Sequence, residues 1–138
     1  MDELARHALP PDVASEGRAR RLVTACVRPL VEAGALDAHA LADLQLMTSE
    51  LMANAILYGH PSAPIDLVVA VDAGRVRVSV HDRGAGFDPE AVDPRMPDAR
   101  QPGGRGLPLV HALSSDWGAA RTGSMLVWCE VPLGGPAP

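Results

Sequence analysis

Glu50 and Asn54 form the first pair of residues whose types and spacing could do chemistry together. They stand four positions apart in the segment SELMANA, and on a helix such residues lie roughly 40° apart around the axis, so both side chains point the same way. A carboxylate beside an amide oxygen suits a magnesium ion that also takes phosphate oxygens, or a general base beside a metal ligand. Taken alone, the pair is more typical of a solvated helix face.

A second candidate site lies where a run of alternating valines ends, in the sequence Asp82-Arg83-Gly84-Ala85-Gly86. The carboxylate of Asp82 could accept a hydrogen bond from the exocyclic amine of a purine, and the two glycines permit a ligand to approach the backbone closely. An ordinary Asp-Gly turn at the end of a strand has the same composition. By itself this segment favours the turn.

The third candidate is the glycine-rich sequence Gly103-Gly104-Arg105-Gly106, which opens an expected short helix. Free backbone N–H groups and the positive end of the helix dipole make such a start an anion site, and Arg105 could add charge. Many plain loops also end in this way, so the binding site and the plain loop remain open alternatives.

Apolar spacing predicts the helices that must position the first pair. One helix is expected over residues 15 to 33, with Ser15 as its N-cap and Gly34 at its end. Asp37 is expected to cap a second, longer helix that runs to about Tyr58. This second helix carries both the carboxylate and the amide of the first candidate site.

Period-two alternation predicts two β-hairpins, and the long stretch between Gly84 and Gly106 is expected to be a functional loop because its four prolines forbid a continuous helix or strand. Helices and antiparallel strands in this order predict an α/β (α+β) two-layer sandwich, with the helices on one face of a mixed, mostly antiparallel sheet. The expected ranges are 65–71 and 76–80 for the first hairpin, 106–115 for a short helix, and 117–121 and 125–131 for the second hairpin.

The 138 residues fit one domain, expected over residues 15–132. Residues 1–14 are expected to be a flexible or extended lead-in, because Pro10 and Pro11 forbid a regular helix there. Residues 133–138, rich in glycine and proline, are expected to form a disordered tail.

Composition excludes several classes of function. The net charge of −5 and the scattered basic residues argue against nucleic acid as a partner. With 47% apolar and 21% charged residues the chain has globular composition and no membrane-spanning run, and its start lacks the pattern of a signal peptide, so a cytoplasmic location is expected. Two distant cysteines and five scattered histidines offer neither a disulfide framework nor metal-ligand spacing.

Two absences narrow the way in which a nucleotide could be held. The chain has no lysine, which excludes a P-loop with its phosphate-binding lysine. Asn54 is the only asparagine, and it stands inside a predicted helix, where asparagine is unfavourable. Any nucleotide must therefore be bound without a P-loop, and Asn54 is a candidate for one of the residues that contact it.

Taken together and in this order, the segments SELMANA, HDRGAGF and GGRGLPLV resemble the N, G1 and G2 boxes of the GHKL ATPases, the superfamily of gyrase, Hsp90 and the histidine kinases. The resemblance is strongest to the stand-alone anti-sigma-factor serine/threonine kinases and covers roughly residues 15 to 132. It implies the Bergerat-type ATP-binding fold.

The resemblance also implies a role for each matching residue. Asn54 would hold the Mg²⁺ that bridges the phosphates of ATP, Glu50 would be the general base that polarises the attacking hydroxyl, and Asp82 would bond the adenine amino group. Residues 87–102 would form the ATP lid. The other implied nucleotide contacts are Gly84 and Gly86 against the base, Gly104 and Gly106 around the phosphates, Arg105 and Leu107 beside them, and Ser124 in place of a threonine that reaches adenine through water.

Two departures from the family pattern keep two functions open. Leu57 and Tyr58 stand where the family commonly has a basic residue followed by histidine. The first function is a Mg-ATP-dependent serine/threonine kinase that phosphorylates a STAS-domain anti-anti-sigma factor and sequesters a sigma factor, with a homodimer as the expected state. The second is a non-catalytic, ATP-gated protein-binding module. A small interaction domain without nucleotide is a third interpretation, which must treat all three segments as coincidence.

Overall fold

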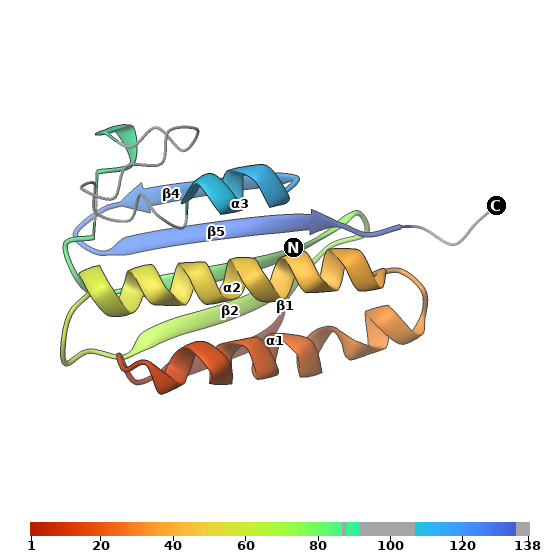
Figure 1. Ribbon diagram of the computed structural model, residues 1–138, viewed down its shortest axis with the longest axis horizontal. Coiled ribbons are helices and arrows are strands. Elements are labelled where there is room, and N and C mark those ends of the chain that lie inside the picture. Colours follow the sequence, from red (N-terminus) through yellow and green to blue (C-terminus); the bar gives the residue numbers. More distant parts are fainter. Residues whose placement is uncertain (87, 92–106, 135–138) are drawn as a thin grey trace.

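The computed structural model describes residues 1–86, 88–91 and 107–134, and it forms two layers (Figure 1). In chain order the described elements are β1 (Asp2–Leu9), α1 (Ala14–Glu32), α2 (Ala38–Tyr58), β2 (Ile65–Val71), β3 (Arg75–Asp82), the 3-10 helix η1 (Pro89–Ala91), α3 (Leu107–Leu113), β4 (Asp116–Arg121) and β5 (Met125–Pro132).

The described strands form one sheet in the order β1-β2-β3-β5-β4. Each pair of neighbours runs antiparallel, so within the described residues the sheet is wholly antiparallel rather than mixed. The predicted α+β two-layer sandwich is confirmed. The hairpins β2–β3 and β4–β5 each make their own antiparallel pair, and β5 then joins the two hairpins by pairing with β3.

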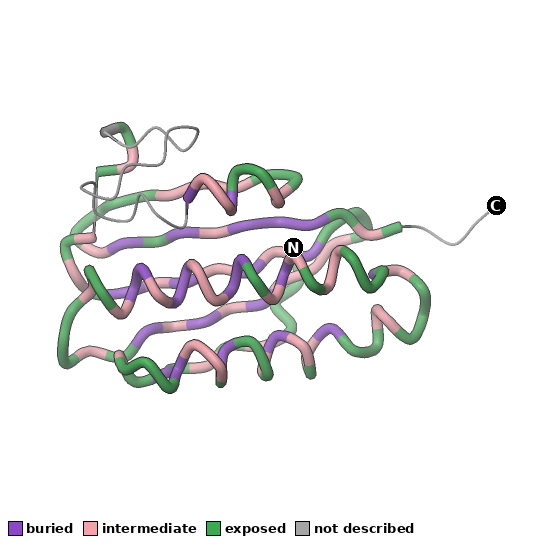
Figure 2. The backbone as a smooth tube through the Cα atoms, in the orientation of Figure 1, coloured by how far each residue is buried: buried purple, intermediate pink, exposed green. Residues whose placement is uncertain are grey.

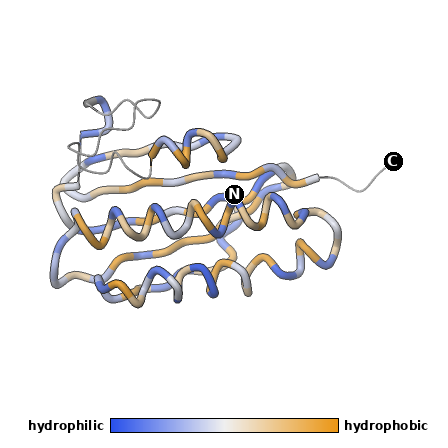
Figure 3. Tube along the Cα trace, in the orientation of Figure 1, coloured by the Kyte–Doolittle hydropathy of each residue, from blue (hydrophilic) through white to orange (hydrophobic). Residues whose placement is uncertain are grey.

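Helices α1, α2 and α3 lie on one face of this sheet, with α2 between α1 and α3 (Figure 1). Burial alternates along the strands and follows one side of each helix (Figure 2), and hydrophobic residues follow the same pattern (Figure 3). The core forms where Leu67 and Val78 of the sheet and Met47 of α2 are all fully buried. Within the described residues, no helix combines the length and the apolar character that crossing a membrane requires.

The helix starts agree with the sequence in one case and differ in the other. Asp37 caps α2 as predicted, because its carboxylate accepts a hydrogen bond from the backbone N–H of Ala40 at 2.7 Å. Ser15 is not the cap of α1, which begins one residue earlier. Its buried hydroxyl instead donates to the carbonyl of Pro10 at 2.6 Å and ties the helix to the segment that leaves β1. Gly34 follows α1 with a φ of 77°, as expected of a residue that ends a helix.

Both ends of the chain are more structured than predicted. Residues 2–9, expected as a lead-in, form the edge strand β1, which pairs with β2 and buries Leu9 completely. At the other end, Leu133 donates its backbone N–H to the carbonyl of Gly74 and Gly134 donates to that of Ala35. The first two residues of the expected tail are thus bonded to the body of the domain, while residues 135–138 lie outside the described residues.

Candidate functional site

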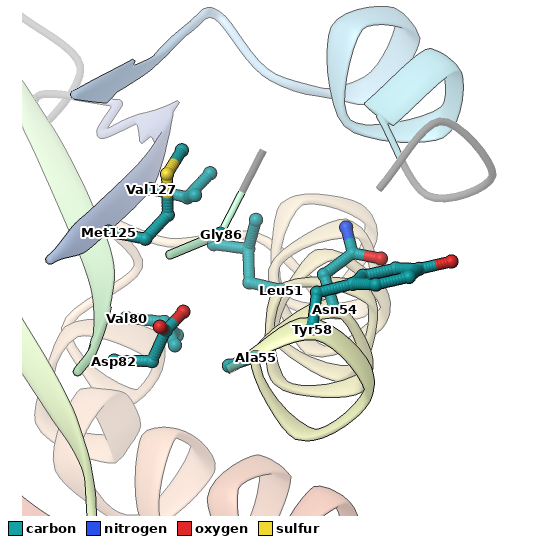
Figure 4. A pocket seen from close by; sticks show the side chains of 9 residues that line it. All are labelled: Leu51, Asn54, Ala55, Tyr58, Val80, Asp82, Gly86, Met125 and Val127. Carbon is teal, nitrogen blue, oxygen red and sulfur yellow. The ribbon is translucent and has the colours of Figure 1, made fainter. Parts of the chain in front are cut away.

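A cavity lies between the C-terminal half of α2 and the adjoining ends of β3 and β5 (Figure 4). Its helical wall comes from one face of α2, because positions three and four apart recur on the same side. Its sheet wall comes from alternate residues of β3 and β5, which face the helices. The lining residues are Leu51, Asn54, Ala55, Tyr58, Val80, Asp82, Gly86, Met125 and Val127.

Asp82 places a buried carboxylate in this cavity, with only 5% of the residue exposed. Its Oδ1 accepts a hydrogen bond from the backbone N–H of Gly84 at 2.8 Å. Burial raises the pKa of Asp82 above its ordinary value, and the Gly84 hydrogen bond and the charge of His81 oppose that rise. One carboxylate oxygen is thus held by the backbone, and the carboxylate keeps capacity to accept from a ligand.

Asn54 contributes an amide whose buried Nδ2 has no hydrogen-bond partner among the described residues. The residue is 9% exposed and lies beside Tyr58 in the cavity wall (Figure 4). A buried polar atom without a partner costs free energy, so such groups are rare in native proteins and often mark function. Because the nitrogen and oxygen of an amide can exchange places by rotation, this group can present either a donor or an acceptor to a ligand.

Glu50 stands one helical turn before Asn54, but it is not among the residues that line the cavity. Its side chain is half-buried, and burial raises the pKa of its carboxyl above the ordinary value. The nearby carboxylate of Glu16, in the first turn of α1, raises this pKa further. A carboxylate with a raised pKa is a better proton acceptor than an ordinary one, which is the property that a general base needs.

The two glycines after Asp82 pack against protein in this structure. A Cβ on Gly84 would lie 2.5 to 2.6 Å from backbone atoms of Gly59 and His60, so Gly84 permits the end of β3 to meet the end of α2. Gly86 lines the cavity, has a φ of 61°, and leaves space that a Cβ would take from Met125 at 2.7 Å. Both glycines are needed by the fold of the site itself, whatever they contact in a ligand.

Ser124, expected to reach adenine through water, is not among the residues that line the cavity. Side chains alternate along β5, and Met125 and Val127 occupy the face toward the helices. Ser124 therefore faces the opposite side of the sheet, where its Oγ lies 2.7 Å from Nε2 of His81.

Of the residues expected to contact phosphates, the structure describes Leu107. Leu107 opens α3 and is 1% exposed within the hydrophobic core, so it supports α3 and does not line the cavity. The expectation that Leu107 flanks the phosphates stays a prediction. Gly104, Arg105 and Gly106 lie outside the described residues, as do residue 87 and residues 92–102 of the expected lid.

Met125, Val127 and Tyr58 line the cavity although the sequence interpretation gave them no role in it. Helical spacing of four from Asn54 could have identified Tyr58, and the alternation of β5 could have identified the other two. Among the described residues, no three His, Cys, Asp or Glu side chains are grouped closely enough to hold a metal ion.

Over residues 9–128 the chain matches a family model described as histidine kinase-like ATPase domain. It is similar to the solved structure of the RsbU and RsbW domains of Rv1364c from Mycobacterium tuberculosis, with 24% identity and a TM-score of 0.70 over 96% of the chain and 33% of that structure. Full-length ShkA in complex with AMPPNP shares 24% identity at a TM-score of 0.57, over 95% of the chain and 32% of that structure.

The SiaB–SiaC complex from Pseudomonas aeruginosa shares 16% identity at a TM-score of 0.55, over 94% of the chain and 90% of that structure. A search of curated proteins found no significant match. The chain thus spans about a third of the Rv1364c structure, and at these identities the structural likenesses show a shared fold.

Proposed function

Because the chain belongs to the histidine kinase-like ATPase domain family, we propose that the cavity between α2, β3 and β5 binds the adenine of ATP. The observation that carries the proposal is that Asn54 and Asp82, from different elements, line one cavity with hydrogen-bonding capacity left over. Family membership agrees with the resemblance seen in the three sequence segments.

Asp82 fits adenine by charge and by direction of hydrogen bonding. A carboxylate only accepts hydrogen bonds, and the exocyclic amine of adenine donates them. The apolar lining from Val80, Val127 and Leu51 suits the faces of a flat base, and the cavity, about 10 Å³ in this structure, must widen to admit one. The same carboxylate would repel the carbonyl oxygen that guanine carries in place of the amine, so the site should prefer adenine.

Asn54 fits a role beside the phosphates. The amide, whose Nδ2 has no partner among the described residues, can turn its oxygen toward a Mg²⁺ ion whose other ligands would be phosphate oxygens and water. When bound, such an ion neutralises charge on the phosphates. Gly104, Arg105 and Gly106 remain the proposed partners of the phosphate chain.

The finer proposal is a serine/threonine kinase of the anti-sigma-factor type. Glu50 would accept the proton of an attacking serine or threonine hydroxyl, and its raised pKa supports that role. The substrate would be a STAS-domain anti-anti-sigma factor, and a sigma factor would be bound in the alternative state. A cytoplasmic location and a homodimer belong to the same proposal. The likeness to a structure of two proteins in complex supports a protein partner.

Two observations favour the second candidate, an ATP-gated binding module without transfer. Glu50 does not line the cavity, and Leu57 and Tyr58 supply no positive charge near it. In that case ATP would change affinity for a partner through differential binding alone.

Two measurements test these proposals. Calorimetry should show that the wild-type chain binds ATP more tightly with Mg²⁺ than without it, and absence of any ATP binding would overturn the proposed site. Radiolabelled ATP should then transfer its γ-phosphate to a purified serine-bearing STAS protein from the same cell. ATP binding with no transfer to the cognate partner would rule out the kinase and leave the binding module.

A further inference from the structure

A hydrogen bond on the sheet face opposite the helices joins His81 of β3 to Ser124, the residue before β5. Nε2 of His81 and Oγ of Ser124 lie 2.7 Å apart. Both residues line a shallow depression on that face, away from the nucleotide cavity. Neither residue is among those that line the cavity.

The bond lies at the point where the pairing of β3 with β5 ends. The last pair of that ladder is Asp82 with Met125, and His81 stands opposite Leu126. Ser124 is thus a diagonal neighbour of His81, at a distance that side chains on one face of a sheet can span. The bond ties together the residues that immediately precede Asp82 and Met125.

Those two following residues are walls of the cavity on the other face. Met125 also contacts Gly86, where a Cβ would lie only 2.7 Å from its side chain, so a shift of Met125 would move or crowd Gly86. Asp82, Met125 and Gly86 all line the cavity. The position of each depends on how the end of the ladder is held.

Neighbouring residues hold both partners of the His81–Ser124 hydrogen bond in place. The backbone N–H of Thr122 donates to the carbonyl of Ser124 at 3.0 Å, and Gly123 has a φ of 81°, which closes the β4–β5 turn. Nδ1 of His81 lies 3.9 Å from Oδ2 of Asp66 on β2, so the ring has a polar neighbour on its other side as well. The serine hydroxyl can donate to Nε2 or accept from it, according to the tautomer of the ring.

We propose that His81 and Ser124 are positioning residues for adenine recognition: their hydrogen bond fixes where Asp82 and Met125 stand in the cavity behind them. This inference rests on the proposed binding of ATP. Loss of the bond moves the Asp82 carboxylate relative to the base, so the preference of the site for adenine over guanine falls. A change that only weakens the fold would lower the affinities for both nucleotides together.

The test is calorimetry of ATP and GTP binding to the wild type, Ser124→Ala, His81→Ala, the double variant and Ser124→Thr. Ser124→Ala should lower ATP affinity roughly threefold to tenfold, the range that one hydrogen bond supports, and lower the ratio of ATP to GTP affinity. The double variant should lose no more than either single variant. Ser124→Thr, which keeps the hydroxyl, should restore the ratio.

Ser79→Ala is the matched control, because Ser79 lines the same depression from β3 and makes no side-chain hydrogen bond among the described residues. It should keep the wild-type ratio. If the wild type binds ATP and Ser124→Ala keeps the wild-type ratio, the inference is overturned while the proposed function stands. A wild type that does not bind ATP overturns both.

Discussion

Gly84 packs directly on Gly59, so that a Cβ on Gly84 would lie 2.6 Å from the Cα of Gly59. Gly59 is equally confined, because its own Cβ would lie 3.1 Å from the Cβ of Asp82 and 2.3 Å from the carbonyl oxygen of Ala55. Two residues without side chains thus let the end of α2 meet the end of β3. This contact places Asn54 and Asp82 on the same cavity.

We expect Gly84→Ala to separate these two ends. Real Cβ atoms essentially never lie within 3.0 Å of backbone, so α2 or the turn after β3 must move. Overpacking of this kind typically costs about 1–3 kcal/mol of the free energy of unfolding, and ATP affinity should fall with it. Denaturant unfolding and calorimetry measure both effects. Gly74→Ala is the control, since its Cβ would meet only one atom, at 3.9 Å. Equal behaviour of the two variants would contradict the packing argument.

We expect Asp82→Asn to weaken ATP binding and stabilise the fold at neutral pH. Burial raises the pKa of Asp82, so the folded state favours the protonated form, and ionisation destabilises the fold as pH rises from the unfolded pKa through the folded one. The neutral amide removes that cost, and the stability advantage should shrink as pH falls below the unfolded value of about 3.9. Loss of a hydrogen bond to a charged group should lower ATP affinity roughly tenfold or more. Unchanged ATP affinity would refute the assignment of Asp82.

The parts of the fold that depend on local spacing were predictable. Asp37 caps α2 and the turn after β2 joins two strands because the residues that decide these features are adjacent in the chain. The edge strand β1 has no such local signal: its outer side is exposed, Leu4 is 44% exposed, and only pairing with β2 defines it. Edge strands of this kind are recognisable only once their neighbour is known.

The site was predictable in its residue types and less so in its geometry. Asn54 and Asp82 were identified by pattern and do line one cavity. Ser124 lies on the opposite face from Met125, because side chains alternate along a strand, and the pattern alone did not indicate which face it takes. The contact of Gly59 with Gly84 joins positions 25 residues apart. Each glycine alone looks like a residue that ends a helix or a strand, so the sequence does not indicate that the two meet.

We expect Asn54→Ala to abolish the dependence of ATP affinity on magnesium without destabilising the fold. The variant removes a buried amide nitrogen that has no partner among the described residues, and it places a better helix former in α2. The free energy of unfolding should therefore stay level or rise. Calorimetry at several magnesium concentrations measures the first effect and denaturant unfolding the second. An ATP affinity that still rises with magnesium in the variant would remove Asn54 from the metal site.

We expect Glu50→Gln to abolish phosphate transfer while ATP affinity stays at the wild-type level, because Glu50 does not line the cavity. Loss of a general base typically costs roughly 10²–10⁴-fold in rate.

Glu16→Gln tests the role of the Glu50 carboxylate without changing Glu50 itself. Removing the charge of Glu16 lowers the pKa of Glu50, although burial, the larger cause, still holds it above the ordinary value.

The base then stays ionised to lower pH in Glu16→Gln, so the acidic limb of the transfer rate should shift toward lower pH. Glu32→Gln, at the other end of α1, makes the same change of charge and should leave the profile in place. Transfer rates measured against pH with radiolabelled ATP separate these outcomes. Equal pH profiles in the wild type, Glu16→Gln and Glu32→Gln would mean that ionisation of the Glu50 carboxyl does not limit the transfer rate.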